Sequence, residues 1–164
     1  MPNATRRAAT LGALALFAAL ALRPPPAAAQ TEAVHSIPRF TFENGAAMQD
    51  MKVGYATWGR LNERRDNAVL LVPGTSSGRM FAASYIGPGK AFDPERHFII
   101  GADPIGGGNS SKPADGMGPD FPRYTIRDMV RAQHHLVTQG LGLRRLLARW
   151  AAPPWAPSRD WNGA

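Results

Sequence analysis

The chain has 164 residues, of which 44% are hydrophobic, so it fits one globular domain at most. It contains no Cys, which excludes disulfides and thiolate metal sites, and its four scattered His predict no metal site. The net charge is +7 for the whole chain and +4 beyond residue 29, where there are 16 basic and 12 acidic residues. The sequence has no basic stripe interleaved with aromatic residues, so it does not predict nucleic-acid binding.

The first 29 residues have the parts of a secretory signal peptide. Arg6 and Arg7 precede the apolar run of residues 8–22, and small residues follow up to Ala29. The run is shorter than the about 20 residues that a transmembrane helix needs. We therefore expect cleavage near Ala29, a periplasmic or secreted mature chain that begins near Gln30, and no membrane span.

Residues 39–58 predict an antiparallel hairpin. Phe40 and Phe42 flank a polar residue, residues 43–45 (Glu-Asn-Gly) are a turn sequence, and residues 51–56 alternate again. A polar stretch then leads to a continuous apolar run, residues 68–72, which is typical of a parallel strand buried on both faces.

The loop after residues 68–72 is the first candidate site. Gly74 and Gly78 let the backbone turn sharply at the carboxyl end of a strand, where open α/β sheets place their binding sites. The backbone N–H of Thr75, beside Gly74, is a candidate donor to an oxyanion. A plain strand-to-loop turn is the alternative.

A second apolar strand, residues 98–101, leads into the most distinctive stretch of the chain. The pattern D-x-x-G-x-G-x-S-x-K-P runs from residue 103 to residue 113 and contains Asp103, Gly106, Gly108 and Ser110. It lacks the Lys-Ser/Thr of a phosphate-binding P-loop and the complete G-x-G-x-x-G of a dinucleotide fold. We expect these four residues to form a structural loop of the site, with an ordinary glycine-rich turn as the alternative.

Residues 126–139 predict an amphipathic helix that packs on the sheet. Thr125 and Asp128 form a capping-box-like start, apolar residues follow at helical spacing, and Gly140 ends the helix. The adjacent His134 and His135 point about 100° apart and cannot both bind one metal ion. We expect no metal and no other cofactor.

The order of these segments resembles the opening half of an α/β-hydrolase. Five stretches are similar to its homoserine O-acetyltransferase-like branch: FENG, GYATWGRLN, LLVPGTSSG, HFIIGADPIGGGNSSKP and YTIRDMVRAQHHLV. The resemblance implies a truncated α/β-hydrolase fold in residues 30–148, with the N-terminal hairpin, the first parallel strands and one helix. It also implies that the N–H of Thr75 helps to bind an oxyanion, although Pro73 stands where the family usually has His.

The resemblance implies hydrolysis or transfer of the acyl group of a small ester by a Ser nucleophile with His and Asp partners. The G-x-S-x-G sequence of that nucleophile is absent, so we expect no intact catalytic residue and an inactive chain. No spacing predicts a substitute triad among Asp103, His97 and the loop serines Ser76, Ser77, Ser84, Ser110 and Ser111. A non-catalytic periplasmic binding module is the alternative, and homoserine is an unexpected substrate for an exported protein.

Residues 149–164 form a tail outside the resemblance. The strand that carries the nucleophile should begin within residues 143–148, but Pro153 and Pro154 cannot lie in a central strand. We expect the tail to be out of frame. A shifted frame can be read from the third base of the Arg149 codon. Because Trp has a single codon, several residues of this shifted frame are fixed. The codon choices that remain allow the string VGGSSMGAFQGLEWG. This string contains G-x-S-x-G and resembles the missing segment, with a divergent tail in the correct frame as the alternative.

Overall fold

The structure of the protein is a computed structural model that describes residues 30–74 and 77–151, with the backbone alone at residues 150 and 151. The expected signal peptide, the candidate donor Thr75 and the Pro-rich part of the tail lie outside these residues. Within the described ranges, no helix is long and apolar enough to cross a membrane, and no group of three or more His, Asp or Glu could hold a metal ion.

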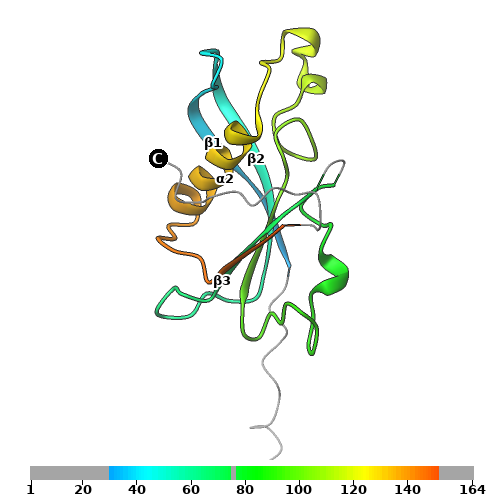
Figure 1. Cartoon of the computed structure of the whole chain (residues 1–164), viewed down its shortest axis with the longest axis vertical. Coiled ribbons are helices and arrows are strands. Elements are labelled where there is room, and N and C mark those ends of the chain that lie inside the picture. Colours follow the sequence, from blue (N-terminus) through cyan, green and yellow to red (C-terminus); the bar gives the residue numbers. More distant parts are fainter. Residues whose placement is uncertain (1–29, 75–76, 152–164) are drawn as a thin grey trace, which may run out of the picture.

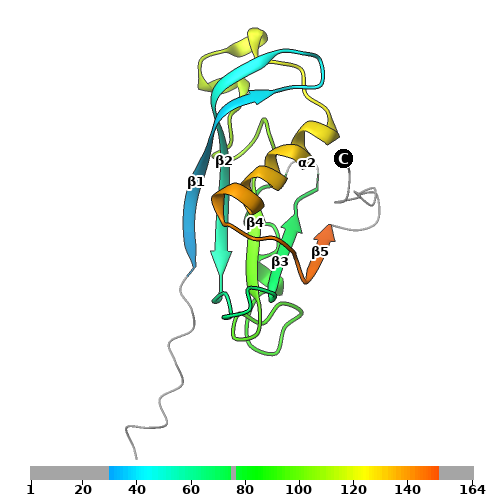
Figure 2. The same cartoon turned by 90° about the vertical axis from the view of Figure 1, so that its left-hand side faces the viewer.

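Five strands form one mixed sheet in the order β1-β2-β4-β3-β5, as Figures 1 and 2 show. Their bounds are β1 Thr31–Thr41, β2 Ala47–Trp58, β3 Ala68–Val72, β4 Phe98–Ala102 and β5 Ala148–Ala151. Strands β1, β2 and β4 pair antiparallel, whereas β3 is parallel to both of its neighbours, β4 and β5. The carboxyl ends of β3, β4 and β5 therefore lie at the same edge of the sheet.

The hairpin of β1 and β2 is longer than the alternation in the sequence predicts. β1 begins at Thr31, eight residues before the predicted start, and pairs with β2 from Thr31↔Thr57 to Thr41↔Ala47. The turn is closed by a hydrogen bond from the Phe42 N–H to the Ala46 carbonyl (2.8 Å), with Gly45 at φ +85°. The early part of β1 was missed because its side chains are mostly exposed and show no apolar alternation.

Helix α2 (Ile126–His135) packs on one face of the sheet and has the predicted capping box. The Thr125 side chain accepts from the Asp128 N–H, and the Asp128 carboxylate accepts from the Thr125 N–H (3.0 Å). The predicted helix does not stay α-helical to its end, because Leu136–Gly140 form a π-helical turn. Three short 3-10 turns, Ala83–Tyr85, Pro113–Asp115 and Gly118–Asp120, lie in the connecting segments.

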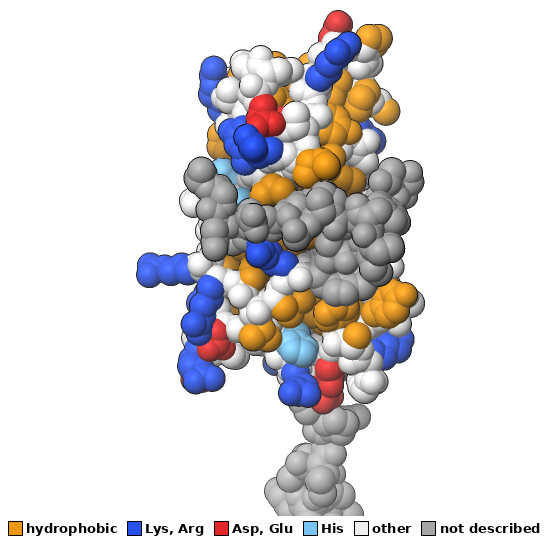
Figure 3. Space-filling view, in the orientation of Figure 1, with side chains coloured by type: hydrophobic (Ala, Val, Ile, Leu, Met, Phe, Trp, Pro, Cys, Tyr) orange, Lys and Arg blue, Asp and Glu red, His pale blue; other side chains and the backbone are white. Residues whose placement is uncertain are grey.

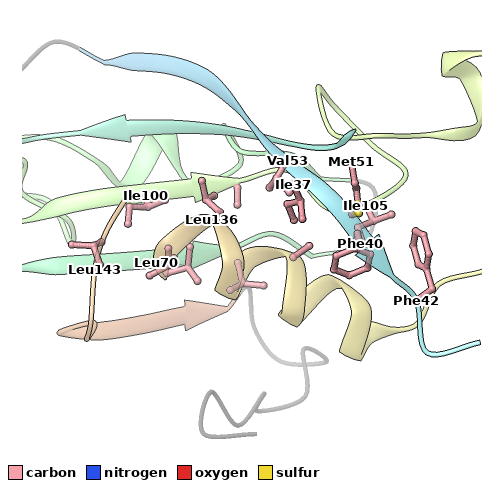
Figure 4. Packing of buried hydrophobic residues seen from close by; sticks show 14 of the residues in the cluster. Ile37, Phe40, Phe42, Met51, Val53, Leu70, Ile100, Ile105, Leu136 and Leu143 are labelled. Atoms are coloured by element: carbon pink, nitrogen blue, oxygen red, sulfur yellow. The ribbon is translucent and has the colours of Figure 1, made fainter. Parts of the chain in front are cut away.

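The main core lies between the sheet and α2, as Figure 4 shows. Leu70 of β3 and Ile100 of β4 are fully buried there against Leu136 and Leu143. Burying one such side chain contributes about 1.5–3 kcal/mol. A smaller cluster on the other face of the sheet includes Leu71 and Ile99 and is covered by partly buried residues of the segment after β3.

Strand β5 begins at Ala148, the last residue of the predicted window, and continues to Ala151. The Leu147 N–H donates to the Ala68 carbonyl (2.7 Å), and the register then runs from Val69↔Ala148 to Val72↔Ala151. Residues 149–151 are expected to belong to the tail, but in the structure they continue a strand that pairs in parallel with β3. Parallel pairing uses backbone groups, so it does not depend on the apolar periodicity that the sequence analysis followed.

Charge is spread over the face of the molecule seen in Figure 3. Lys and Arg side chains lie around this face with acidic side chains between them. Exposed arginines form surface ion pairs, such as Arg64 with Asp66 (3.4 Å) and Arg127 with Glu43 (3.1 Å).

Candidate active site

Two loops that follow parallel strands meet at the carboxyl edge of the sheet. The first follows β3 (Ala68–Val72) and is described at Gly74 and residues 77–79, while Thr75 and Ser76 lie outside the described residues. The second follows β4 and runs from Asp103 to Lys112. The two loops touch at Gly78, where an added Cβ atom would lie 2.8 Å from the Asp103 carboxylate.

The carboxylate of Asp103 joins the two loops. The residue is 2% exposed, and its oxygens accept hydrogen bonds from the Arg79 N–H (2.7 Å), the Arg79 guanidinium (2.6 Å) and the Asn109 N–H (2.8 Å). Hydrogen bonds to a charged group each contribute about 1.5–3 kcal/mol. Asp103 is therefore in the position to fix the loop after β3, which carries the candidate oxyanion donor, relative to the loop after β4.

Glycines make room for this carboxylate on three sides. A Cβ atom at Gly54 of β2, at Gly78 or at Gly108 would lie 2.5, 2.8 or 2.3 Å from atoms of the Asp103 side chain. Gly108 also has φ +56°, which side-chain-bearing residues rarely adopt. The glycine-rich loop thus surrounds a carboxylate of the chain itself.

Gly106 has a different neighbour. Its φ is +87°, and an added Cβ atom would lie 2.1 Å from the Tyr124 hydroxyl oxygen, just before α2. The Gly106 N–H also donates to the Ser111 carbonyl (2.9 Å). This glycine lets the loop after β4 pass close to the segment that enters α2.

Arg79 extends the network to the first strand of the sheet. Its guanidinium contacts Asp103 on one side, and its Nε donates to the Glu32 carboxylate of β1 (3.0 Å) on the other. The hydrogen bond to Glu32, followed by that to Asp103, raises the pKa of Arg79, while its burial acts in the opposite direction. Arg79 stays charged and links β1, the loop after β3 and the end of β4.

The two serines of the second loop attach it to β2. The Ser110 Oγ accepts from the Gly54 N–H (3.0 Å) and donates to the Asp103 carbonyl (3.2 Å). The Ser111 Oγ accepts from the Lys52 N–H (2.9 Å). Both side chains are nearly or fully buried, so these hydroxyls hold the loop in place and are not arranged as nucleophiles.

His97 and Asp103 do not come together. They flank β4 at its two ends, six residues apart, which corresponds to roughly 20 Å at about 3.3 Å per residue. The Nδ1 atom of His97 is buried without a hydrogen-bond partner among the described residues. A substitute triad from His97, Asp103 and a serine of these loops is therefore not formed.

Sequence reasoning identified Asp103, Gly106, Gly108 and Ser110 but missed Arg79, Gly54 and Asn109. A glycine inside a strand, such as Gly54, signals a close approach by another segment and could have been noticed. Arg79 gives no such signal, because its partners are 24 and 47 residues away in the sequence.

Comparison with known proteins gives O-acyltransferases among the relatives, although no protein-family model matches the chain. The homoserine O-succinyltransferase of Magnetococcus marinus is 42% identical over 128 residues, which cover 65% of this chain and 32% of that protein. The homoserine O-acetyltransferase of Chlorobium chlorochromatii is 39% identical over 118 residues, with 65% and 33% covered. The chain thus spans about a third of the length of these relatives.

Solved structures show the same partial similarity. An acetylester hydrolase from Corynebacterium glutamicum matches with a TM-score of 0.68 at 35% identity, covering 74% of this chain and 36% of that structure. A homoserine O-acetyltransferase from Bacillus anthracis matches with a TM-score of 0.63 at 28% identity, covering 74% and 39%. In both matches, well under half of the solved structure is covered.

Proposed function

We propose that this chain is the N-terminal part of an exported enzyme acting on small acyl esters. The chain belongs to the α/β-hydrolase superfamily, and its relatives are homoserine O-acyltransferases. The enzyme either hydrolyses the ester or transfers its acyl group. The chain as it stands is inactive. The observation that carries the proposal is the meeting of the loops after β3 and β4 at the edge where β5 ends.

The position of β5 supports the proposed frameshift. In the α/β-hydrolases that this chain resembles, the next strand along the chain delivers the nucleophilic Ser on a sharp turn from strand to helix. β5 pairs with β3 and ends at Ala151. In the alternative reading frame, the string VGGSSMGAFQGLEWG begins inside β5 and puts the Ser of G-x-S-x-G a few residues beyond its end. We infer that a frameshift near the Leu147 codon separates the chain from its nucleophile.

The chemistry of the intact enzyme follows from these positions. The Ser oxygen attacks the ester carbonyl, a His takes its proton, and an Asp orients the His. The backbone N–H of Thr75 stabilises the negative charge that develops on the carbonyl oxygen. When the intermediate collapses, the His returns the proton to the leaving alcohol, and the acyl group then passes from Ser to water or to an acceptor alcohol. Asp103 and Arg79 support this step by holding the loop that carries Thr75.

The proposal includes export of the protein from the cytoplasm. The signal-like residues 1–29 support a mature chain in the periplasm or outside the cell. There, an ester hydrolase or an acyltransferase with an external acceptor is a more suitable function than homoserine biosynthesis. A cell-fractionation experiment with the whole gene product tests this part. Recovery of the uncleaved chain in the cytoplasm would contradict it.

The decisive experiment restores the reading frame and applies a fluorophosphonate probe, which labels activated serines. We expect labelling of the frame-restored protein, no labelling after its G-x-S-x-G serine is replaced by Ala, and no labelling of the 164-residue chain. Sequencing of the gene across the Leu147 codon provides the control for the frameshift. A confirmed intact frame with no related open frame behind it, or a stable unlabelled short chain with a binding partner, would contradict the proposal.

A further inference from the structure

The fold brings together two histidines that are 100 residues apart. His35 lies on β1 (Thr31–Thr41), and His135 is the last residue of α2 (Ile126–His135). The Nε2 atom of His35 lies 2.9 Å from the Nδ1 atom of His135. The ring centroids are 5.1 Å apart, and the ring planes are tilted by 33°. The two imidazoles therefore form a direct hydrogen bond between the sheet and the helix.

Gly140, just beyond α2, leaves space for the His35 ring. The π-helical turn Leu136–Gly140 ends with Gly140, where an added Cβ atom would lie 2.8 Å from His35 Nδ1. The turn is closed by hydrogen bonds from the Leu141 N–H to the Leu136 carbonyl (2.8 Å) and from the Leu143 N–H to the Val137 carbonyl (2.9 Å). π-Helical turns are rare and frequently mark functional positions.

The two ends of α2 are attached to the hairpin by different chemistry. At its first turn, the Asp128 carboxylate accepts a hydrogen bond from the Glu43 N–H in the turn between β1 and β2 (3.0 Å). At its last turn, the contact with β1 is the histidine pair. A carboxylate stays charged at any pH near neutrality, whereas imidazoles titrate between pH 5 and 8. The C-terminal end of α2 is thus the pH-sensitive end.

The hydrogen bond sets a limit on the number of protons that the pair can hold. One ring nitrogen donates its hydrogen and the facing nitrogen must keep a lone pair. A first additional proton can sit on an outer nitrogen and leaves the hydrogen bond intact. A second one places N–H against N–H and two positive charges side by side, so the hydrogen bond does not survive it.

Three other titratable or charged groups of the described residues lie on the elements that carry the pair or pack beside it. Tyr55 of β2 lies on the same face of the sheet, and His134 and Arg131 are the neighbouring titratable or charged groups of α2. Arg131 already contacts Asp128 and the Phe40 ring. Within the described residues, no carboxylate forms an ion pair with His35 or His135.

Burial, and then the neighbouring His135, lower the pKa of His35. In the unfolded chain the imidazole binds its proton near pH 6.5, while in the folded chain it stays neutral to a lower pH. The unfolded state therefore binds more protons in this range, and the stability contributed by the neutral pair is present above pH 6.5 and is lost as the pH falls through the lowered pKa.

We propose that His35 and His135 form a pH-sensitive clasp that holds the end of α2 and its π-helical turn on β1 near neutral pH and releases them on acidification. The clasp is independent of the proposed acyl-ester chemistry. It lies on the helix-covered face of the sheet, whereas the two candidate loops lie at the carboxyl edge of the strands.

Amide hydrogen exchange of the full chain tests the clasp at the two hydrogen bonds that close the π-helical turn. From pH 7.5 to pH 4.5, we expect the protection factors of Leu141 and Leu143 to fall by about tenfold or more relative to Ile100 in the centre of β4, because the unfolded state binds more protons than the folded state in this range. His35→Gln, which keeps a polar side chain that does not titrate, should remove this pH dependence. His134→Gln, the matched control beside the pair, should retain it.

Two results would overturn the proposal. One is a pH profile that is the same in the parent chain and in His35→Gln, and the other is a flat profile in the parent chain. If His35→Gln loses protection at Ile100 and is therefore unfolded, an NMR titration of imidazole resonances in the parent chain decides. Coupled titration of His35 and His135 supports the clasp, whereas independent titration at ordinary values contradicts it.

Discussion

The two loops at the carboxyl edge of the sheet are held in different ways. The loop after β4 is attached along β2 by backbone and side-chain hydrogen bonds, including those of Ser110 and Ser111. The loop after β3, in its described residues 74 and 77–79, is hydrogen-bonded to other elements through Arg79 alone. The first loop is thus built into the sheet, and its Asp103 then positions the second. In this arrangement the described part of the loop after β3 depends on the loop after β4 for its position.

Removing the charge of Asp103 should have the largest effect on this difference. Asp103→Asn leaves the partly buried Arg79 without its buried partner, and breaking a buried ion pair costs about 3–5 kcal/mol. We expect the free energy of unfolding in urea to fall by about this amount. Asp115→Asn, which affects a surface pair with Lys112, is the matched control and should leave the midpoint unchanged. Equal effects of the two changes would contradict the special position of Asp103.

Filling the space beside Asp103 should have the next largest effect. Gly108→Ala combines a strained φ of +56° with a Cβ atom placed 2.3 Å from the carboxylate, and we expect a loss of about 2–4 kcal/mol. Gly118→Ala has a similar positive φ, +49°, but its Cβ atom would meet nothing within 4 Å. The difference between the two unfolding free energies measures the contact with Asp103. If it is zero, the glycine is needed for the turn alone.

Changing Arg79 tests the link between the loops directly. Arg79→Lys keeps the positive charge but cannot reach Asp103 and Glu32 together, so we expect a loss of about 1–2 kcal/mol and faster hydrogen exchange at the amide of residue 79. Exchange at Ser111, in the loop after β4, should stay the same. Arg127→Lys, in an exposed pair with Glu43, is the control. Faster exchange in both loops would show that they are not held separately.

An effect no larger than that of Arg79→Lys is expected for Ser110. Ser110→Ala leaves the buried Gly54 N–H without its partner, which costs about 1–2 kcal/mol. Ser84→Ala, at an exposed serine in a 3-10 turn, should cost nothing measurable. Thermal unfolding of both variants checks this. A Ser110→Ala protein as stable as the parent would mean that the other hydrogen bonds of the loop after β4 are sufficient to hold it.

The comparison of the loops also shows where sequence reasoning succeeded. The apolar runs at residues 68–72 and 98–101 predicted β3 and β4, and the predicted capping box of Thr125 and Asp128 is confirmed. The predicted class of fold is confirmed by the sheet order and by the solved structures that the chain resembles. The oxyanion role of Thr75 and the frameshift stay predictions.

Other features could not be found from the sequence. The start of β1 and the last residues of β5 lack apolar alternation, so their strand character comes from pairing with β2 and β3. His135 was judged against its neighbour His134, whereas its partner in the structure is His35. Arg79 lies in a stretch without a motif. In each case the partner is distant along the chain.

Local periodicity and turn chemistry along the chain are enough to predict the order of the strands and the helix, the class of the fold and the two glycine-rich loops. Only the tertiary structure decided what the glycines surround, which charge links the loops and which histidines meet. The physical reason is that Asp103, Arg79 and His35 acquire their roles from contacts between segments that the sheet brings together. No local pattern in the sequence specifies such contacts.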